Sequence, residues 1–145
     1  MKYIIFILFI LITLFFPIDA QSIKWYSPEK GFAKAAKEKK IVLVDIYTDW
    51  CGWCKKMDKE TYANKSVAKA LNKNFVCVKY NPEKDGNIKV GGKVYDPDAF
   101  QKMTNVTGYP ATAFFRSDGK FIETVMGYLE KKYMIDEVIP YIRKK

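Results

Sequence analysis

Two runs of apolar residues limit what this chain of 145 residues can fold into. Residues 41–47 (Ile-Val-Leu-Val-Asp-Ile-Tyr) and residues 75–80 (Phe-Val-Cys-Val-Lys-Tyr) are nearly continuous and rich in β-branched side chains. Such runs are typical of strands buried on both faces, because a half-exposed strand would alternate apolar and polar residues. Helical patterns precede and separate the two runs. The sequence therefore predicts an α/β domain.

The remaining elements fit that class. A first helix is expected to begin at Ser27, whose hydroxyl would cap it, with Pro28 in its first turn. Pro140 is expected to bend or fray the final turn of the last helix. The further predicted elements, in chain order, are a helix over residues 51–62, a short helix capped by Ser66, a hairpin over residues 88–95, a helix opening at Asp96, strands over residues 111–115 and 121–125, and a helix over residues 129–142. Together they predict one central mixed β-sheet flanked by α-helices on both faces.

The first 20 residues are typical of a secretory signal peptide. Lys2 precedes an apolar run over residues 4–16, and the small residue Ala20 stands at the expected cleavage site. The run is shorter than the ~20 residues that a membrane-spanning helix needs. We therefore expect residues 1–20 to be a cleaved signal peptide and residues 21–145 to be one domain, periplasmic or secreted. An uncleaved leader would instead anchor the domain to the membrane, still outside the cytosol.

Composition excludes several kinds of chemistry. The chain has no histidine, which rules out Ser-His-Asp hydrolysis, Cys-His proteolysis and imidazole acid–base catalysis within it. The net charge is +9, but the lysines are scattered and the arginines are only Arg116 and Arg143. A nucleic-acid-binding surface would more often cluster arginines, so we expect a solvated lysine-rich surface and no nucleic-acid partner.

Cys51 and Cys54 stand where the first buried strand gives way to a helix. A thiolate is the reactive form of cysteine, and a helix N-terminus stabilises negative charge, so the pKa of Cys51 should be lowered. Cys54 lies one turn further along, where it can close a disulfide with Cys51. Its less favourable position in the helix dipole and its expected burial should make it the less reactive thiol. Cys51 would therefore attack a substrate disulfide and Cys54 would resolve the mixed disulfide.

Other uses of paired cysteines fit less well. Structural zinc needs four ligands, and the chain offers one pair, an isolated Cys77 and no histidine. Covalent haem attachment would normally place a histidine where Lys55 stands. We therefore expect no metal and no cofactor, and we expect Cys77 to be an inert buried thiol.

Three motifs resemble those of the thioredoxin family. Residues 44–55 are similar to its strand, buried acid and Trp-Cys-Gly-X-Cys-Lys centre, residues 108–111 to its glycine and cis-proline, and residues 126–128 to its late glycine loop. The resemblance covers most of residues 24–142 and implies the thioredoxin fold.

The resemblance implies roles for two charged residues in the buried strands. Asp45 would be the carboxylate that moves a proton to and from Cys54, through water, and Lys79 would bring its ammonium close to this acid. Burial would raise the pKa of Asp45 toward neutrality, where a proton relay works. The residues alone also allow a purely structural Asp45 and a Lys79 that faces solvent.

The resemblance also implies a substrate-binding surface. Pro110 would follow Tyr109 through a cis peptide bond, leaving the Tyr109 backbone to pair with an extended substrate, although an ordinary strand-entry proline is an alternative. The other residues expected on this surface, some of whose aromatic rings could equally be ordinary packing, are Trp50, Gly52, Trp53, Gly127 and Tyr128.

These features predict a thiol–disulfide oxidoreductase that acts on proteins outside the cytosol, as a reductase recharged by a membrane-bound electron donor. Trp53 stands where cytosolic thioredoxins carry proline, so a disulfide oxidase or isomerase is an alternative. A binding module without turnover is another. The segment over residues 82–96 is longer than the family's usual connection and is either a partner-binding hairpin or a neutral insertion.

Overall fold

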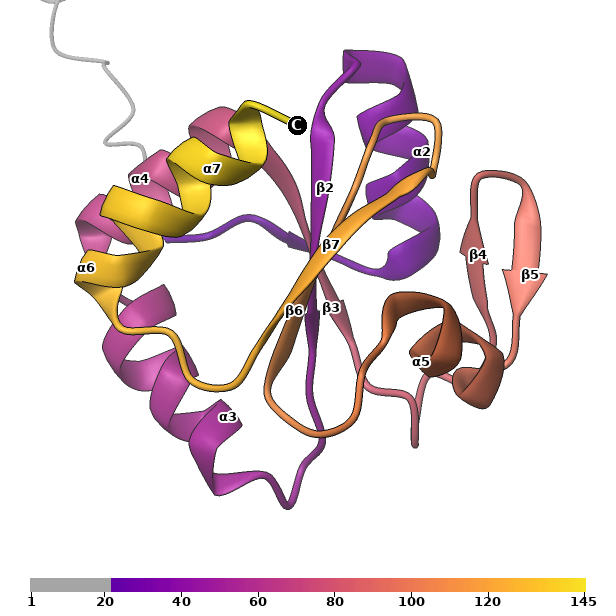
Figure 1. Cartoon of the computed structure of the whole chain (residues 1–145), viewed down its shortest axis with the longest axis horizontal. Coiled ribbons are helices and arrows are strands. Elements are labelled where there is room, and N and C mark those ends of the chain that lie inside the picture. The colour runs from indigo at the N-terminus through magenta and orange to yellow at the C-terminus, as the bar shows by residue number, and fades with distance from the viewer. Residues whose placement is uncertain (1–21) are drawn as a thin grey trace, which may run out of the picture.

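A computed structural model describes residues 22–145, which form a five-stranded mixed sheet (Figure 1). The strand order is β1-β3-β2-β6-β7, in which β1, β3 and β2 are parallel and β6 and β7 are antiparallel to their neighbours. The strands are β1 (Trp25–Tyr26), β2 (Ile41–Ile46), β3 (Phe75–Tyr80), β6 (Ala111–Phe115) and β7 (Phe121–Met126). The predicted α/β class and mixed sheet are confirmed, whereas β1 was not predicted because two residues show no periodicity.

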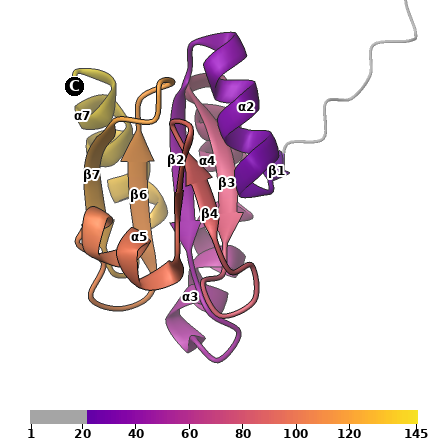
Figure 2. The ribbon, with the colours of Figure 1, turned by 90° about the vertical axis from the view of Figure 1, so that its right-hand side faces the viewer.

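Helices cover both faces of this sheet, as predicted. Figure 1 shows α3, α4, α6 and α7 on one side, and Figure 2 shows α2, α5 and the β4–β5 hairpin on the other. The helical elements are α2 (Pro28–Glu38), α3 (Gly52–Met57), η1 (Asp58–Tyr62), α4 (Lys65–Asn74), α5 (Pro97–Thr104), α6 (Lys131–Tyr133), η2 (Met134–Val138) and α7 (Ile139–Arg143). The hairpin strands are β4 (Ile88–Val90) and β5 (Lys93–Tyr95).

The central strand β2 divides its side chains between two apolar clusters. Val42, Val44 and Ile46 pack into the cluster beneath α2 and α5, and Leu43 packs into the cluster beneath α3, α4 and α7. Side chains alternate between the faces of a sheet, so Asp45 points to the same face as Leu43. The one acid of the strand is therefore directed at α3 and η1.

Two helix starts differ from the sequence predictions. Ser27 precedes α2, but its hydroxyl makes no capping hydrogen bond, and Pro28 begins the helix. The cap of α4 is Asn64 and not Ser66, because the Asn64 Oδ1 accepts hydrogen bonds from the backbone N–H groups of Ser66 (3.0 Å) and Val67 (3.2 Å). Both asparagine and serine are good capping residues, so composition alone does not choose between two positions so close together.

Two predicted helices contain π-helical turns. The helix expected over residues 51–62 is α3 followed by η1, and the last helix begins at Lys131 and passes through η2 before Pro140. Proline has no N–H to donate to the carbonyl four residues earlier, and a wider turn accommodates that loss. Of the two effects expected of Pro140, fraying does not occur, since α7 continues to Arg143, and the helix is distorted by η2 instead.

Residues 1–20, predicted to be a signal peptide, lie outside the described residues. Within residues 22–145, no helix is long and apolar enough to cross a lipid bilayer.

The β4–β5 hairpin is part of the core. Ile88 and Val90 are buried in the cluster beneath α2, and the tip of the hairpin meets the turn between β6 and β7. A Cβ atom added to Gly119 in that turn would lie 2.4 Å from the Cα of Gly91 at the tip. The two backbones therefore approach closely only because both positions are glycine.

Gly119→Ala is expected to lower the free energy of unfolding by about 2–4 kcal/mol, because a side chain there is disfavoured by both the backbone conformation and the contact with Gly91. Gly119 has a φ of +86°. Gly92 provides a matched control, since it has a φ of +83° but no atom within 4 Å of an added Cβ. Gly92→Ala should therefore cost only about 1–2 kcal/mol. Equal losses in urea unfolding would contradict the close contact.

Candidate active site

The two predicted redox cysteines form a disulfide at the start of α3. The Cys51 Sγ and Cys54 Sγ atoms are 2.10 Å apart, and Cys51 is the residue that caps the helix. The Cys51 Sγ accepts a hydrogen bond from the backbone N–H of Cys54 at 3.1 Å. A helix N-terminus and an N–H donor both favour a thiolate at Cys51 when the disulfide is reduced.

Burial does not distinguish the two cysteines. Cys51 is 4% exposed and Cys54 is 5% exposed, so the expected burial of Cys54 is confirmed but is shared by Cys51. Both side chains lie beneath the loop and helix start that they occupy. The two cysteines differ in position, because only the sulfur of Cys51 accepts a hydrogen bond from a backbone N–H at the start of the helix.

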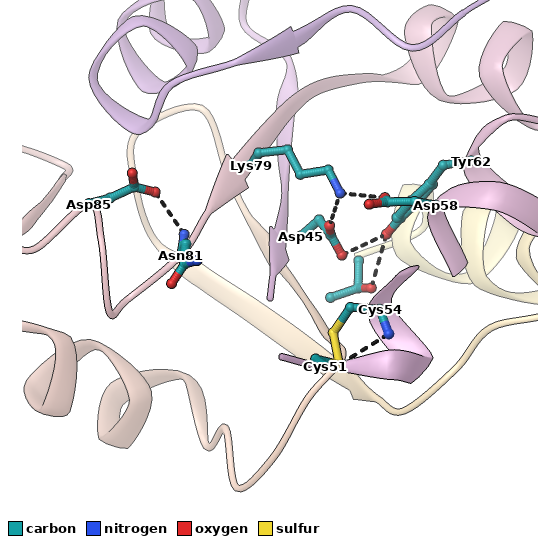
Figure 3. A network of polar contacts seen from close by, with 9 residues as sticks. Asp45, Cys51, Cys54, Asp58, Tyr62, Lys79, Asn81 and Asp85 are labelled. Carbon is teal, nitrogen blue, oxygen red and sulfur yellow. Dashed lines mark hydrogen bonds and ion pairs between the residues drawn. A yellow bond between two sulfur atoms is a disulfide. The ribbon is translucent and has the colours of Figure 1, made fainter. Parts of the chain in front are cut away.

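Asp45 lies beneath the disulfide in a network of polar contacts (Figure 3). It is 2% exposed, yet both of its oxygens have partners. Lys79 Nζ lies 2.7 Å from Oδ2, and the Tyr62 hydroxyl donates a hydrogen bond to Oδ1 over 3.2 Å. Lys79 also pairs with Asp58. The alternative of a Lys79 that faces solvent is therefore wrong.

The ammonium of Lys79 is surrounded by aromatic rings as well as by carboxylates. Nζ lies 4.9 Å from the ring centroid of Trp25, 4.8 Å from that of Tyr47 and 5.5 Å from that of Tyr62. The faces of such rings attract a cation that has lost water. Burial disfavours the ammonium, but the carboxylates of Asp45 and Asp58 outweigh it, so the pKa of Lys79 is raised.

The pKa of Asp45 is also raised. The main cause of this rise is burial, which disfavours the carboxylate, and the attraction of Lys79 offsets the effect of burial only in part. Asp45 therefore binds a proton more readily than an ordinary aspartate. Figure 3 shows Cys54 on the side of the disulfide that faces Asp45, which is the arrangement a proton exchange between them requires.

Sequence analysis did not identify three members of this network: Asp58, Tyr62 and Thr112. Asp58 and Tyr62 follow Cys54 at intervals of four residues, a spacing that places all three on one helical face. That signal was present in the sequence. Thr112 is opposite Asp45 across β2 and β6, and only the register of the two strands reveals it.

The expected substrate-binding residues surround the cysteines. Trp50 is 67% exposed and Trp53 is 57% exposed. The Trp50 ring meets that of Tyr109 at 5.8 Å, and the Trp53 ring meets that of Tyr128 at 5.7 Å. Lys56 lies over both rings of the second pair. Two aromatic pairs thus flank the disulfide.

The backbone around these pairs is held in place. The Tyr109–Pro110 peptide bond is cis, and the Pro110 carbonyl accepts a hydrogen bond from the N–H of Gly127 at 2.8 Å. The Trp50 Nε1–H donates to Glu83 over 2.9 Å. Pro110 and Gly127 are therefore adjacent, although 16 residues separate them in the sequence.

The remaining cysteine lies in the apolar cluster on the face of the sheet that carries Asp45. Cys77 is buried in β3, and burial raises its pKa to about 12, so it is a neutral thiol near pH 7. Within residues 22–145, no three His, Cys, Asp or Glu side chains gather where they could hold a metal ion.

A protein-family model for DsbH-type thioredoxin-like proteins, described as DUF255 and of unknown function, matches residues 16–141. The chain belongs to this family. Its fold is the thioredoxin fold, and with the Cys51–Cys54 pair the domain is thiol–disulfide-oxidoreductase-like.

The chain matches a small part of two longer relatives and nearly the whole of one solved structure. The chain is 32% identical over 80 residues to mouse spermatogenesis-associated protein 20 and 31% identical over 104 residues to the thiol:disulfide interchange protein DsbD of Pseudoalteromonas atlantica. The matches cover 54% and 70% of this chain, but only 9% and 16% of those much longer proteins. The solved structure of a DsbH oxidoreductase aligns with a TM-score of 0.64 at 17% identity, over 89% of this chain and 90% of that one.

Asp45→Asn is expected to raise the free energy of unfolding at neutral pH. The pKa of Asp45 in the folded protein lies above its ordinary value of 3.8, so the folded state loses stability as the pH rises from that value through the raised pKa. Asparagine does not ionise and escapes this loss. The advantage of the variant, measured by urea unfolding, should be smallest near about pH 3 and grow as the pH increases.

Glu137→Gln, at an exposed carboxylate on η2, controls for the removal of an acid. An advantage of Asp45→Asn that is the same at every pH would contradict a raised pKa for Asp45.

Proposed function

We propose that this chain is a thiol–disulfide oxidoreductase that reduces disulfides in proteins outside the cytosol. The observation that carries the proposal is the Cys51–Cys54 disulfide at the start of α3, above a buried carboxylate that is paired with an ammonium. A purely structural disulfide would have no use for a buried acid that binds protons readily. Thiol–disulfide exchange does use such an acid, because a thiol must lose its proton before it attacks a disulfide.

The reaction conserves electrons in two exchange steps. The Cys51 thiolate attacks one sulfur of the substrate disulfide, forming a mixed disulfide and releasing the first substrate thiolate. Asp45 takes the proton of Cys54 through water, and the Cys54 thiolate then attacks the Cys51 sulfur. The Cys51–Cys54 disulfide forms and the second substrate thiol leaves, so the substrate gains two electrons that the cysteine pair loses.

The substrate is held by the surface around the cysteines. Trp50, Trp53 and Tyr109 supply apolar contacts, and the backbone at Tyr109 precedes the cis peptide bond, where an extended chain can pair with it. No hydrogen bond within residues 22–145 occupies the Tyr109 backbone. Gly52 and Gly127 leave room for a substrate backbone, since nothing lies within 4 Å of a Cβ added to either.

The place of action follows from the leader. Residues 1–20 would direct residues 21–145 across the membrane, into the periplasm or out of the cell. Outside the cytosol, the Cys51–Cys54 disulfide must be reduced again after each turnover. A membrane-bound dithiol protein would supply those two electrons, and the similarity to a thiol:disulfide interchange protein supports this.

Cys54→Ser is expected to accumulate a mixed disulfide between Cys51 and a chain of insulin, because the group that resolves this intermediate is absent. Mass spectrometry after mixing the reduced variant with insulin measures the adduct. Cys51→Ser should form none, and Cys77→Ala should reduce insulin as the wild type does. Capture of insulin without any covalent adduct would instead indicate a binding module.

The direction of exchange has its own test. A reductase is expected to show a redox potential of about −270 mV, whereas the potential of a disulfide oxidase or isomerase would be about −180 to −120 mV. A disulfide oxidase or isomerase is the alternative because Trp53 stands where cytosolic thioredoxins carry proline, and the residues between the cysteines tune the redox potential. Equilibration with glutathione buffers, read by thiol alkylation of the Cys77→Ala variant, measures the Cys51–Cys54 pair alone. A value in the second range would overturn the reductase proposal.

A further inference from the structure

We propose that Tyr62 is a positioning residue for this exchange: its hydroxyl holds Asp45 as a carboxylate and turns to Thr112 when Asp45 takes up the proton of Cys54. The inference rests on the proposed function, since it concerns how Asp45 serves the cysteine pair. It gives a role to the hydroxyl groups of Tyr62 and Thr112, which the exchange steps above do not use.

The three side chains are in contact with one another and almost entirely buried. Asp45 is 2% exposed, Tyr62 4% and Thr112 0%. The Tyr62 oxygen lies 3.2 Å from Asp45 Oδ1 and 3.5 Å from Thr112 Oγ1, and in the second contact either oxygen can be the donor. The Tyr62 hydroxyl therefore has one neighbour on each side.

The position of Lys79 determines which oxygen of Asp45 can bind a proton. Its ammonium lies 2.7 Å from Oδ2 and can only donate, so a proton on that oxygen would face a cation with no acceptor. Oδ1 is the oxygen that remains, and it faces the Tyr62 hydroxyl. Protonation of Asp45 must therefore change the contact between Asp45 and Tyr62.

Protonation reverses the roles in that contact. While Asp45 is ionised, the Tyr62 hydroxyl donates to Oδ1. When Oδ1 carries a proton, that proton becomes the donor, and the Tyr62 oxygen must accept it. The hydroxyl hydrogen of Tyr62 then needs another acceptor, because an unpaired buried donor is costly. Thr112 Oγ1 is the acceptor within reach.

The fold holds Tyr62 in position for both states. Its ring packs edge-on against Trp25, with the centroids 5.0 Å apart and the planes at 81°. Thr112 is paired with Asp45 in the register of β2 and β6, so its side chain points to the same face of the sheet. Burial also raises the pKa of Tyr62 well above 10.0, so the phenol acts as a neutral hydroxyl.

Other titratable groups face Asp45 from each element packed against it and remain unchanged in the variants below. These groups are Lys79 and Cys77 from β3, Asp58 from η1, Tyr47 from the end of β2, and Cys54 from α3.

Two conservative variants should move the pKa of Asp45 in opposite directions. Tyr62→Phe removes the donor to the carboxylate and should raise this pKa by about one unit, because hydrogen bonds to a charged group are the stronger ones. Thr112→Val removes the acceptor that the protonated state needs and should lower the pKa. Carboxyl ¹³C NMR titration of the reduced protein measures both shifts.

Tyr141→Phe is the matched control, because it removes an exposed hydroxyl that donates to Glu123 and should leave the pKa of Asp45 unchanged. A merely structural role for the two buried hydroxyls would not produce shifts of opposite sign. An unchanged pKa of Asp45 in Tyr62→Phe, or shifts of the same sign in both variants, overturns the proposal.

Activity measurements separate this inference from the proposed function. In wild-type protein, the rate of insulin reduction should fall at low pH, and in Tyr62→Phe that fall should begin about one pH unit higher. In an Asp45→Asn background, Tyr62→Phe should cause no further shift. An inactive wild type would refute the proposed function, whereas an active wild type with an unshifted Tyr62→Phe profile would refute the role of Tyr62 alone.

Discussion

The structure depends on the burial of one carboxylate in its central strand. Asp45 is surrounded by protein on every side, and a buried charge is tolerated only when each of its acceptors is satisfied. Lys79 from β3 and Tyr62 from η1 satisfy the two oxygens. Because each partner comes from a different element, the sheet and its covering helix must assemble together for the acid to be accommodated.

The same arrangement places the disulfide above the acid. The chain leaves β2 immediately after Asp45 and Ile46, turns, and enters α3 at Cys51. The helix then runs back over the face of the sheet toward which Asp45 points, and η1 continues it. The start of the helix therefore favours negative charge at Cys51, while the turns that follow bring Tyr62 over Asp45.

Sequence analysis predicts the parts of this arrangement that depend on local pattern. The buried runs identified β2 and β3 within one residue, and the Cys51–Cys54 spacing indicated the disulfide at the start of α3. Other members of the network depend on tertiary structure instead. Thr112 is an ordinary strand residue until the register brings it opposite Asp45, and Trp25 belongs to a strand too short to show a pattern.

The ion pair itself contributes little stability, because a buried ion pair contributes less than apolar residues of the same size would. On its face of the sheet, stability comes from the apolar cluster around it, which includes Leu43, Met57 and Phe114. The opposite face carries the second apolar cluster. There, Val42, Val44 and Ile46 pack among aromatic rings, including Phe100, which lies 5.2 Å from the ring of Tyr80.

The β4–β5 hairpin completes that apolar face. Ile88 and Val90 extend the cluster, and the contact between Gly91 and Gly119 joins the hairpin to the sheet. The first strand of the hairpin is thus part of the core, whereas Val94 on β5 is 64% exposed. Because side chains alternate along β2, Val42, Val44 and Ile46 join one apolar cluster while Asp45 lies on the other face, and the added hairpin enlarges that first cluster.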